Sequence, residues 1–442
     1  MKESSTEAVR SRVSVSTESS SAPAVPAESE EARSWLHRVA GALTHRNYRL
    51  LWLAALGSTI GTWMQNYAQA WLVFDLTKSN FYLGLDTFLA QLPVLLFMLI
   101  GGVVADRHDR RLLLTGSQYV QMFSAFTLTA LILTGHVEVW YIFVLSFVSG
   151  CGQAFGGPAY QSLIPQLVPR RDLPNAIALN STQFNLSRVL GPTAGGIVLA
   201  LVGTAGCFAL NGLSFFFVVF ALSRLQLPPH QRPTRASALR EELKAGLRHV
   251  RNDRLVLTLT ILVFFSTFLT MPILTMLPSF ATDVLTANGH APQTRLSMLL
   301  ACQGLGSIIG ALTIGGLGRF KHMGRVLLVV QVVLGVLIAA FAQSRVLTLS
   351  LVLLLVGGIF FMMVFSISFS LVQLTVPDDL RGRVVSIYMV ALRGGWPIGS
   401  LVAGAMADKF TAPVVMGVNG LLLSLVAAVL LLFWRNSALQ RA

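Results

Sequence analysis

Two arginines stand near the middle of long apolar runs, where a charge is expensive. Arg188 lies four residues before Pro192, and Arg393 lies four residues before Pro397. A charged side chain at the centre of a bilayer costs ~2.5–3.5 kcal/mol on insertion scales and rarely faces lipid. We expect both arginines to point inward. They can serve a cavity for anionic or acceptor-rich solutes, or donate to helix carbonyls that the prolines leave free, and both readings stay open.

Uncharged polar side chains extend this candidate cavity. Asn66 and Gln69 are three residues apart in the first apolar run, so they share one face of a helix. They can contact a solute, or form amide bonds between helices worth ~0.6–2 kcal/mol. Gln153, in the fourth run, is a candidate of the same kind. We predict a substrate cavity lined by Asn66, Gln69, Gln153, Arg188 and Arg393.

Proton coupling needs a group that titrates, and Asp86 is the one acid plainly inside an apolar run. It lies about one turn from the predicted end of that run. We predict Asp86 as the candidate proton site. The alternative is a solvated acid at a helix start, which the helix dipole favours.

Other chemistries find no support in the sequence. There is no GxxxxGK[ST] phosphate loop, no HExxH, no serine elbow and no metal-binding cluster. Cys151, Cys207 and Cys302 lie in apolar runs and read as small buried residues. We therefore expect no enzyme activity, no metal, no cofactor and no nucleic-acid partner.

The elements that must position these residues are membrane-spanning helices. Of the 442 residues, 54% are hydrophobic and 12% are charged, whereas soluble domains carry about 25% charged residues. Apolar runs of about 20 residues, enough to cross a bilayer as helices, recur along the chain. We predict an all-α membrane protein with spans at 50–74, 82–105, 112–134, 139–162, 175–203, 205–223, 255–281, 296–317, 326–343, 347–373, 384–407 and 412–434.

The chain divides into four parts. We expect a disordered cytoplasmic tail with a basic lead-in at 1–44, a six-helix bundle at 45–225, a cytoplasmic linker at 226–254, and a second six-helix bundle with a short tail at 255–442. The start has no cleavable signal peptide pattern. The linker predicts an amphipathic helix lying on the membrane surface or on the base of the bundles. Its apolar face comprises Leu239, Leu243, Leu247 and Val250.

Orientation follows from the placement of Lys and Arg. They gather before the first run, in every second loop and in the tail, whereas the opposite loops hold only Lys78, Arg295, Arg345 and Lys409. Basic loops stay in the cytoplasm. We predict a multi-pass protein of the cell inner membrane with both termini cytoplasmic.

The two sets of six runs share landmarks. GGVVADRHDRR at 101–111 is answered by GGLGRFKHMGR at 315–325, and QLVPRRDLPNA by QLTVPDDLRGR. The arginine and proline pairs of the fifth and eleventh runs follow the same order. Two duplicated, pseudo-symmetric bundles with a site between them are typical of secondary transporters.

These motifs also resemble a known family. GGVVADRHDRR is similar to the loop signature of the major facilitator superfamily, and RVLGPTAGG resembles its antiporter-associated motif. HRNYRLLW, DLTKS and LNSTQFNLSRVLGP resemble the drug and siderophore exporter branch, typified by enterobactin exporters and macrolide efflux proteins. The resemblance implies the major facilitator fold. It also implies a helix-interface motif made of Gly191, Pro192, Gly195 and Gly196.

In the resembled family the first loop acts as a latch that holds the cytoplasmic side shut. Carried over, the latch comprises Gly102, Asp106, Arg107, Arg110 and Arg111. The glycine would let a neighbouring helix approach closely, and the aspartate would pair with the other bundle. The alternative is a plain basic loop on the cytoplasmic side. The second copy has Phe320 where the first has Asp106.

We therefore predict a secondary active transporter that exports a small amphipathic organic solute, of the drug or siderophore class, by alternating access. Its partners would be that solute, protons or another coupling ion, and the lipid bilayer, and we expect a monomer. The alternative within transport is uptake of an organic anion, suggested by the two arginines. From another class, the alternative is a non-transporting membrane receptor or a lipid scramblase on the same fold.

Overall fold

The computed structural model describes residues 41–226, 239–286, 289–318, 320–377 and 380–432. Most of the predicted tail at 1–44, the first part of the linker and the last ten residues lie outside this set. The described part of the chain is built of helices and short connections.

The first bundle begins with a short 3₁₀ turn, η2 (Gly41–Thr44), and has a second, η3 (Arg170–Asp172), before its last helix. That helix, α6, replaces two predicted spans, because it turns at Gly203 without a loop. Gly203 has φ 74°, a conformation that glycine adopts without steric cost. The long helices are α2 (Arg46–Thr77), α3 (Asn80–Arg107), α4 (Arg110–Leu133), α5 (Val139–Leu167) and α6 (Leu173–Arg224).

The second bundle opens with a broken span. The stretch predicted at 255–281 is α8 (Arg254–Thr270), α9 (Pro272–Ser279) and the π-helical turn η4 (Phe280–Val284). Pro272 ends the first segment because proline donates no helical hydrogen bond. The remaining helices are α10 (Pro292–Leu317), α11 (Met323–Gln343), α12 (Leu347–Thr375), α13 (Arg381–Phe410) and α14 (Ala412–Leu432).

Length and hydropathy agree with a membrane fold. Among the described residues, nine helical segments are long and apolar enough to cross a bilayer, with the two arms of α6 counted as one. The second arm of α6, together with α2 and α4, completes twelve. Large apolar side chains also face outward on these helices, such as Phe217, Leu312 and Leu201, which is 79% exposed. Exposed apolar surface of this kind fits lipid and not water. The predicted all-α, twelve-helix membrane fold is confirmed.

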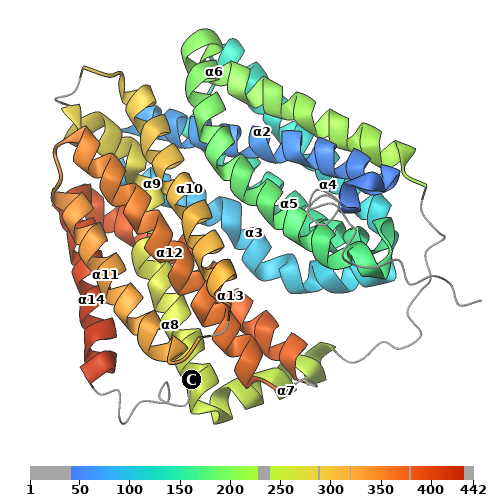
Figure 1. Ribbon diagram of the computed structural model, residues 1–442. Helices are drawn as coiled ribbons and strands as arrows, with labels where there is room; N and C mark the ends of the chain where they lie inside the picture. Colours follow the sequence, from blue (N-terminus) through green and yellow to red (C-terminus); the bar gives the residue numbers. More distant parts are fainter. Residues whose placement is uncertain (1–40, 227–238, 287–288, 319, 378–379, 433–442) are drawn as a thin grey trace, which may run out of the picture.

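Two helix pairs make the largest contacts between the bundles, α3 with α13 and α6 with α10 (Figure 1), and α9 adds smaller contacts with α3 and α2. Within the first bundle α2 packs on α6 and α3 on α5, and within the second α10 packs on α12 and α11 on α14. Figure 1 shows the bundles close together at one end and apart at the other, where α7 lies. We call the first end the closed face and the second the linker face. The domain boundaries drawn from the sequence stay predictions.

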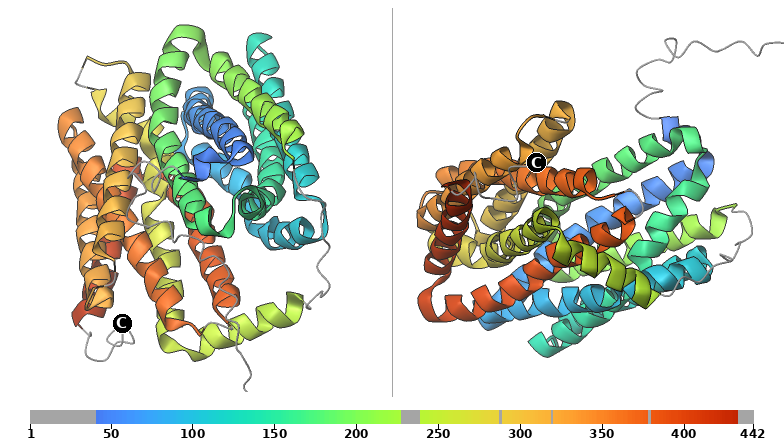
Figure 2. Two further views of the ribbon diagram at one scale, coloured as in Figure 1. Left: turned by 45° about the vertical axis from the view of Figure 1, so that its right-hand side comes forward. Right: turned by 90° about the horizontal axis from the view of Figure 1, so that it is seen from below.

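The linker helix α7 (Leu239–Asn252) runs across the linker face (Figure 2) and packs against α13 and α8. Gly246 lies against Arg383 and Ile387, and Val250 is 3% exposed. Leu247, predicted on the apolar face, is 58% exposed. The small side of the helix at Gly246 permits the close approach to α13, so the packed face is rotated away from Leu247. The side chains of Leu239 and Leu243 lie outside the described set.

Candidate functional site

Arg188 lies at the contact between the bundles. It is about 15 residues along α6, or ~22 Å from the start of that helix. Its Nη2 donates to Gln303 Oε1 on α10 across 3.1 Å, and its guanidinium carbon lies 5.9 Å from the ring centre of Trp63 on α2. This bond goes to a side chain of the other bundle and not to a carbonyl freed by Pro192. The side chain is partly exposed.

The glycines that follow Arg188 let other helices approach α6. A side chain at Gly191 would collide with Trp63, and one at Gly195 would collide with the ring of Tyr67, both on α2. Gly196 instead faces Ser297 of α10, whose hydroxyl donates to the carbonyl of Pro192 across 2.9 Å. The motif predicted at helix interfaces therefore lies against α2 within its own bundle and α10 of the other.

The second inter-bundle contact, between α3 and α13, is close at the backbone level. A side chain at Gly84 would collide with the backbone of Ser400, and one at Gly404 with the backbone of Asn80. At the closed face the Asp408 carboxylate of α13 accepts hydrogen bonds from the start of α3. The donors are the Asn80 amide at 2.7 Å, the Phe81 amide at 3.3 Å and the Ser79 hydroxyl.

Among the described residues, no hydrogen bond joins any two of the five predicted cavity residues. Asn66, Gln153 and Arg393 are exposed, and Arg188 is partly exposed. Gln69 is buried and bonds within its own bundle, so it does not share the exposed face of Asn66. Arg393 lies beside Gly394, which faces Leu95 of α3. The substrate-contacting roles stay predictions.

Asp86 sits in a buried polar network of three helices. It is 8% exposed, so it is not a solvated acid at a helix start. Gln69 Nε2 of α2 donates to its two oxygens at 3.0 and 2.8 Å, and Ser146 of α5 donates to Oδ1 at 2.7 Å. Both partners satisfy a charged carboxylate. A protonated Asp86 would become a donor itself, and the Ser146 hydroxyl would have to turn.

Other polar pairs escaped the sequence reading. Asn211 of α6 donates to Gln65 of α2 across 2.6 Å, and Tyr67 donates to the backbone carbonyl of Gln293 in the other bundle across 2.8 Å. Gln303 and Asp408 were likewise not predicted as site residues. Each of these residues is polar and lies inside or at the end of an apolar run. That position indicates a contact between helices but does not predict which residue is contacted.

Two of the first-loop arginines donate to backbone carbonyls of their own bundle. Arg110 donates to the carbonyl of Ser162 at 3.1 Å, and Arg111 to that of Ser223 at 3.0 Å. Gly102 has open space around it in this structure, whereas Gly101 lies against the Ala154 backbone of α5. The Asp106 side chain lies outside the described set, and the latch stays a prediction.

His45, directly after the predicted lead-in, contacts the turn η3 before α6. His45 Nε2 lies 2.8 Å from Asp172 Oδ2 in η3, and the Asn175 side chain accepts from the Ala42 amide at 2.8 Å. The hydrogen bond from His45, aided by the charge of Arg171, holds the pKa of Asp172 below its usual value. These contacts anchor the start of α2 to the start of α6.

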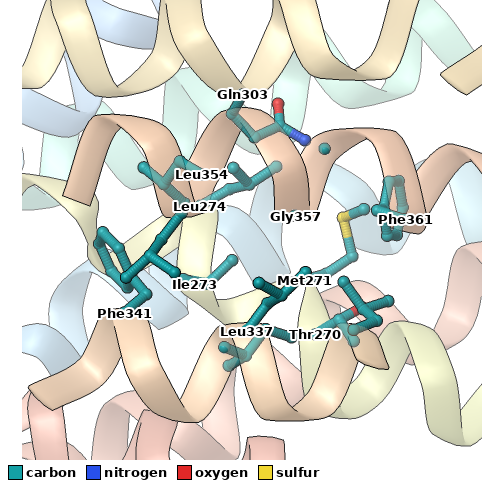
Figure 3. Close-up of a pocket in the computed structure, with 14 residues that line it drawn as sticks. Thr270, Met271, Ile273, Leu274, Gln303, Leu337, Phe341, Leu354, Gly357 and Phe361 are labelled. Atoms are coloured by element: carbon teal, nitrogen blue, oxygen red, sulfur yellow. The ribbon is translucent and has the colours of Figure 1, made fainter. Parts of the chain in front are cut away.

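A small apolar cavity lies inside the second bundle (Figure 3). Met271, at the break between α8 and α9, and Gln303 both line it. Its volume of about 30 Å³ suits a single water molecule and is far below the ~300–1,000 Å³ of ligand pockets. Gln303 therefore connects Arg188 to the interior of the second bundle, but this cavity is not the place for an organic solute.

The matched extent of the chain decides its family. A family model described as transmembrane secretion effector matches residues 39–440, which is nearly the whole sequence. The chain belongs to this family of the major facilitator superfamily. Among the described residues, no group of three or more His, Cys, Asp or Glu side chains could hold a metal ion.

Two relatives of this chain are named as exporters. It is 28% identical to the multidrug efflux pump Tap of Mycolicibacterium fortuitum, over 81% of this chain and 88% of that protein. It is 26% identical to the enterobactin exporter EntS of Citrobacter koseri, over 90% of this chain and 94% of that protein. The predicted resemblance to drug and siderophore exporters is confirmed at this level.

Solved structures share the fold. One is a bacterial homologue of the human lysosomal transporter Spinster, in an inward-facing and occupied conformation. It matches with TM-score 0.71 at 13% identity, over 89% of this chain and 97% of that one. The nucleoside transporter NupG matches with TM-score 0.70 at 14% identity, over 88% and 99%. At these identities the likeness concerns the fold alone.

Proposed function

We propose that this membrane transporter exports a small amphipathic organic solute in exchange for protons, by alternating access, with both termini in the cytoplasm of an inner-membrane-bound monomer. The observation that carries the proposal is the uneven joining of the bundles. Asn80–Asp408 and Gly84–Ser400 join α3 to α13 toward the closed face, and Figure 1 shows the bundles apart at the linker face. A molecule built this way can exchange one joined end for the other.

Proton coupling is supported by the Asp86 network. A buried carboxylate whose partners come from α2 and α5 links protonation to the packing of three helices of one bundle. The names of the curated relatives support export and an organic solute.

The test uses inside-out membrane vesicles that hold the full chain. We expect a pH gradient to drive accumulation of amphipathic dyes, each added dye to collapse part of that gradient, and a protonophore to abolish both effects. Dye accumulation that is unchanged by the protonophore would contradict proton exchange. Lipid flip without dye flux in proteoliposomes would favour the scramblase alternative instead.

A further inference from the structure

We propose that the contact of α2, α6 and α10 around Arg188 binds organic anions in which the acidic group lies next to an aromatic ring. Arg188 would pair with the acidic group, and Trp63 would stack on the ring. The inference rests on the proposed transport function and names the substrate class for it.

The hydrogen-bond capacity of Arg188 is the first argument. A guanidinium carries five N–H donors, and within the described chain Arg188 makes one hydrogen bond, to Gln303. No described Asp or Glu forms an ion pair with it. The side chain is partly exposed, so the remaining donors are accessible to a solute. A carboxylate or phenolate of a solute is the acceptor whose geometry fits the planar fork.

The charge balance points the same way. Asp86, the buried acid of the described spans, is already held by Gln69 and Ser146. Arg393 adds a second positive charge on an exposed part of α13. Positive charge that no acid of the described part offsets raises the local concentration of anions and disfavours cations.

The aromatic requirement comes from Trp63. Its ring lies beside the guanidinium and meets the ring of Phe184 edge-on, with centroids 5.9 Å apart. A flat ring next to a guanidinium offers a stacking surface for a second ring whose acidic group reaches the donors. An aliphatic acid would use Arg188 and leave this surface empty.

The test measures equilibrium binding to the purified full chain without any gradient. Three probes are compared: 2-naphthoate, its neutral isostere 2-naphthamide, and decahydronaphthalene-2-carboxylate. We expect naphthoate to bind about tenfold more tightly than either of the others, because naphthamide loses the charge-assisted contact and decahydronaphthalene-2-carboxylate loses the aromatic stacking contact. Arg188→Gln should remove the preference for charge, Trp63→Leu the preference for the ring, and the control Arg345→Gln neither.

Each variant is first checked for a single folded species. If Arg188→Gln fails that check, two separate variants, Arg188→Lys and Gln303→Leu, replace it. Arg188→Lys should retain only part of the preference for naphthoate over naphthamide. Equal binding of naphthoate and naphthamide by the wild type, or no binding of naphthoate, would overturn the proposal. An Arg188→Gln variant that still binds naphthoate more tightly than naphthamide would also overturn the proposal. Because this experiment measures no proton flux, these outcomes do not bear on proton exchange, which the vesicle experiment tests.

A second inference has independent support: we infer that Asp408 locks the closed face by capping a helix of the opposite bundle. Ser79 is the N-cap of α3 but makes no cap of its own, and the first turn of α3 holds no acidic residue. The amides of Asn80 and Phe81 are instead satisfied by Asp408 from α13. Opening this face must expose those amides and remove the carboxylate from the positive end of the helix.

The test is a distance measured across the closed face. Spin labels at His136 and Arg345, which are exposed and belong to different bundles, are placed in a background where the three cysteines are alanine. We expect Asp408→Ala to increase the long-distance population severalfold and Asp408→Asn to have a smaller effect, because an amide oxygen still accepts. Asp75→Ala is the matched control, since Asp75 pairs with Lys78 within one bundle. Distance distributions of Asp408→Ala that match those of the control would overturn the lock.

Discussion

At the scale of single residues, Asp86 shows how a membrane protein can keep an acid in a buried place. The carboxylate takes hydrogen bonds from Gln69 and Ser146, so its charge is met by donors on two other helices. Each such bond to a charged group is worth about 1.5–3 kcal/mol. Protonation weakens these bonds, which gives a proton a way to act on helix packing.

The first prediction follows from this network. Asp86→Asn keeps the shape and an accepting oxygen but cannot release a proton, so pH-gradient-driven export should fall at least about tenfold. Thermal stability should fall by about 1.5–3 kcal/mol, since the amide oxygen keeps the Ser146 bond and one Gln69 bond but the bond to the second oxygen is lost. Dye export by vesicles and a melting curve are the measurements. Asp75→Asn, an exposed acid, is the control, and undiminished export by Asp86→Asn would remove this acid from the coupling mechanism.

The second prediction concerns pH and Asp172. Its pKa is lowered in the folded chain by His45, so the stabilisation is present above the unfolded value of about 3.9 and is lost as pH falls through the folded pKa. Asp172→Asn should lower stability near pH 7 by about 0.2–1 kcal/mol, as for other ion pairs at a surface, and the difference should shrink in acid. Melting temperatures against pH test this, with Glu138→Gln as control. A difference that grows in acid would have the wrong sign.

The sequence predicts which residues are costly to bury in a membrane, but it does not predict the residues that they contact. Arg188 stands out because a charge in an apolar run needs a reason. Gln303, which accepts its hydrogen bond, is 115 residues away in the chain. The shared face predicted for Asn66 and Gln69 assumed that helical spacing decides exposure. Gln69 instead turns toward Asp86, because a buried acid requires donors.

At the scale of helices, α3 and α13 meet at glycines. Gly84 and Gly404 let the two backbones touch, and such small-residue contacts are the usual means by which membrane helices pack closely. The contact lies on the same side as the Asp408 cap. Backbone contact and cap therefore close the same face.

The third prediction tests that contact. Gly84→Ala puts a methyl group against the Ser400 backbone, and overpacking of this kind costs about 1–3 kcal/mol. We expect the closed face to open in a larger fraction of molecules, measured by the His136–Arg345 label distance. The control is Gly116→Ala on α4, where the added methyl group meets open space. Equal distance distributions for the two variants would show that α3 and α13 can adjust.

Helix positions follow from hydropathy, whereas breaks and rotations follow from packing. The gap predicted between 203 and 205 is the turn at Gly203. The break between α8 and α9 was missed because its residues are as apolar as their neighbours. The packed face of α7 was misplaced at Leu247, since a hydrophobic pattern cannot show that Gly246 meets α13.

At the scale of the whole molecule, the repeat visible in the sequence predicts two bundles but not their relative position. Which end is closed depends on contacts such as Tyr67–Gln293 and Asn80–Asp408, which join residues from different repeats. Orientation in the membrane rests on the basic loops. Of the four basic residues assigned to the opposite loops, Arg295 is instead buried in α10, where it donates to the Leu285 carbonyl.

The fourth prediction tests orientation. A reporter active only in the cytoplasm, fused after Ala442, should be active, because an even number of spans returns the chain to the side of its start. A reporter active only in the periplasm should be silent at the same site. The opposite pattern would contradict the count of twelve spans or the expected side of the N-terminus.

The last prediction joins both faces. The structure has the closed face joined through Asp408, whereas the predicted latch at Asp106 would join the linker face in the other state. Weakening the two should therefore shift one equilibrium in opposite directions. Asp408→Asn should favour the state open at the closed face, and Asp106→Asn should favour the state seen here. A loss of about 1.4 kcal/mol in either gives about a tenfold shift, and the double variant should return near the wild type because distant effects add.

The same His136–Arg345 label distance measures all three variants, and Asp75→Asn serves as the control. Transport by Asp106→Asn should slow at equal protein level, since the state closed at the linker face is populated less. Shifts in the same direction would show that one of the two aspartates acts on overall stability and not on a gate. An Asp106→Asn variant with wild-type distances and wild-type flux would leave Asp408 as a lock without a counterpart.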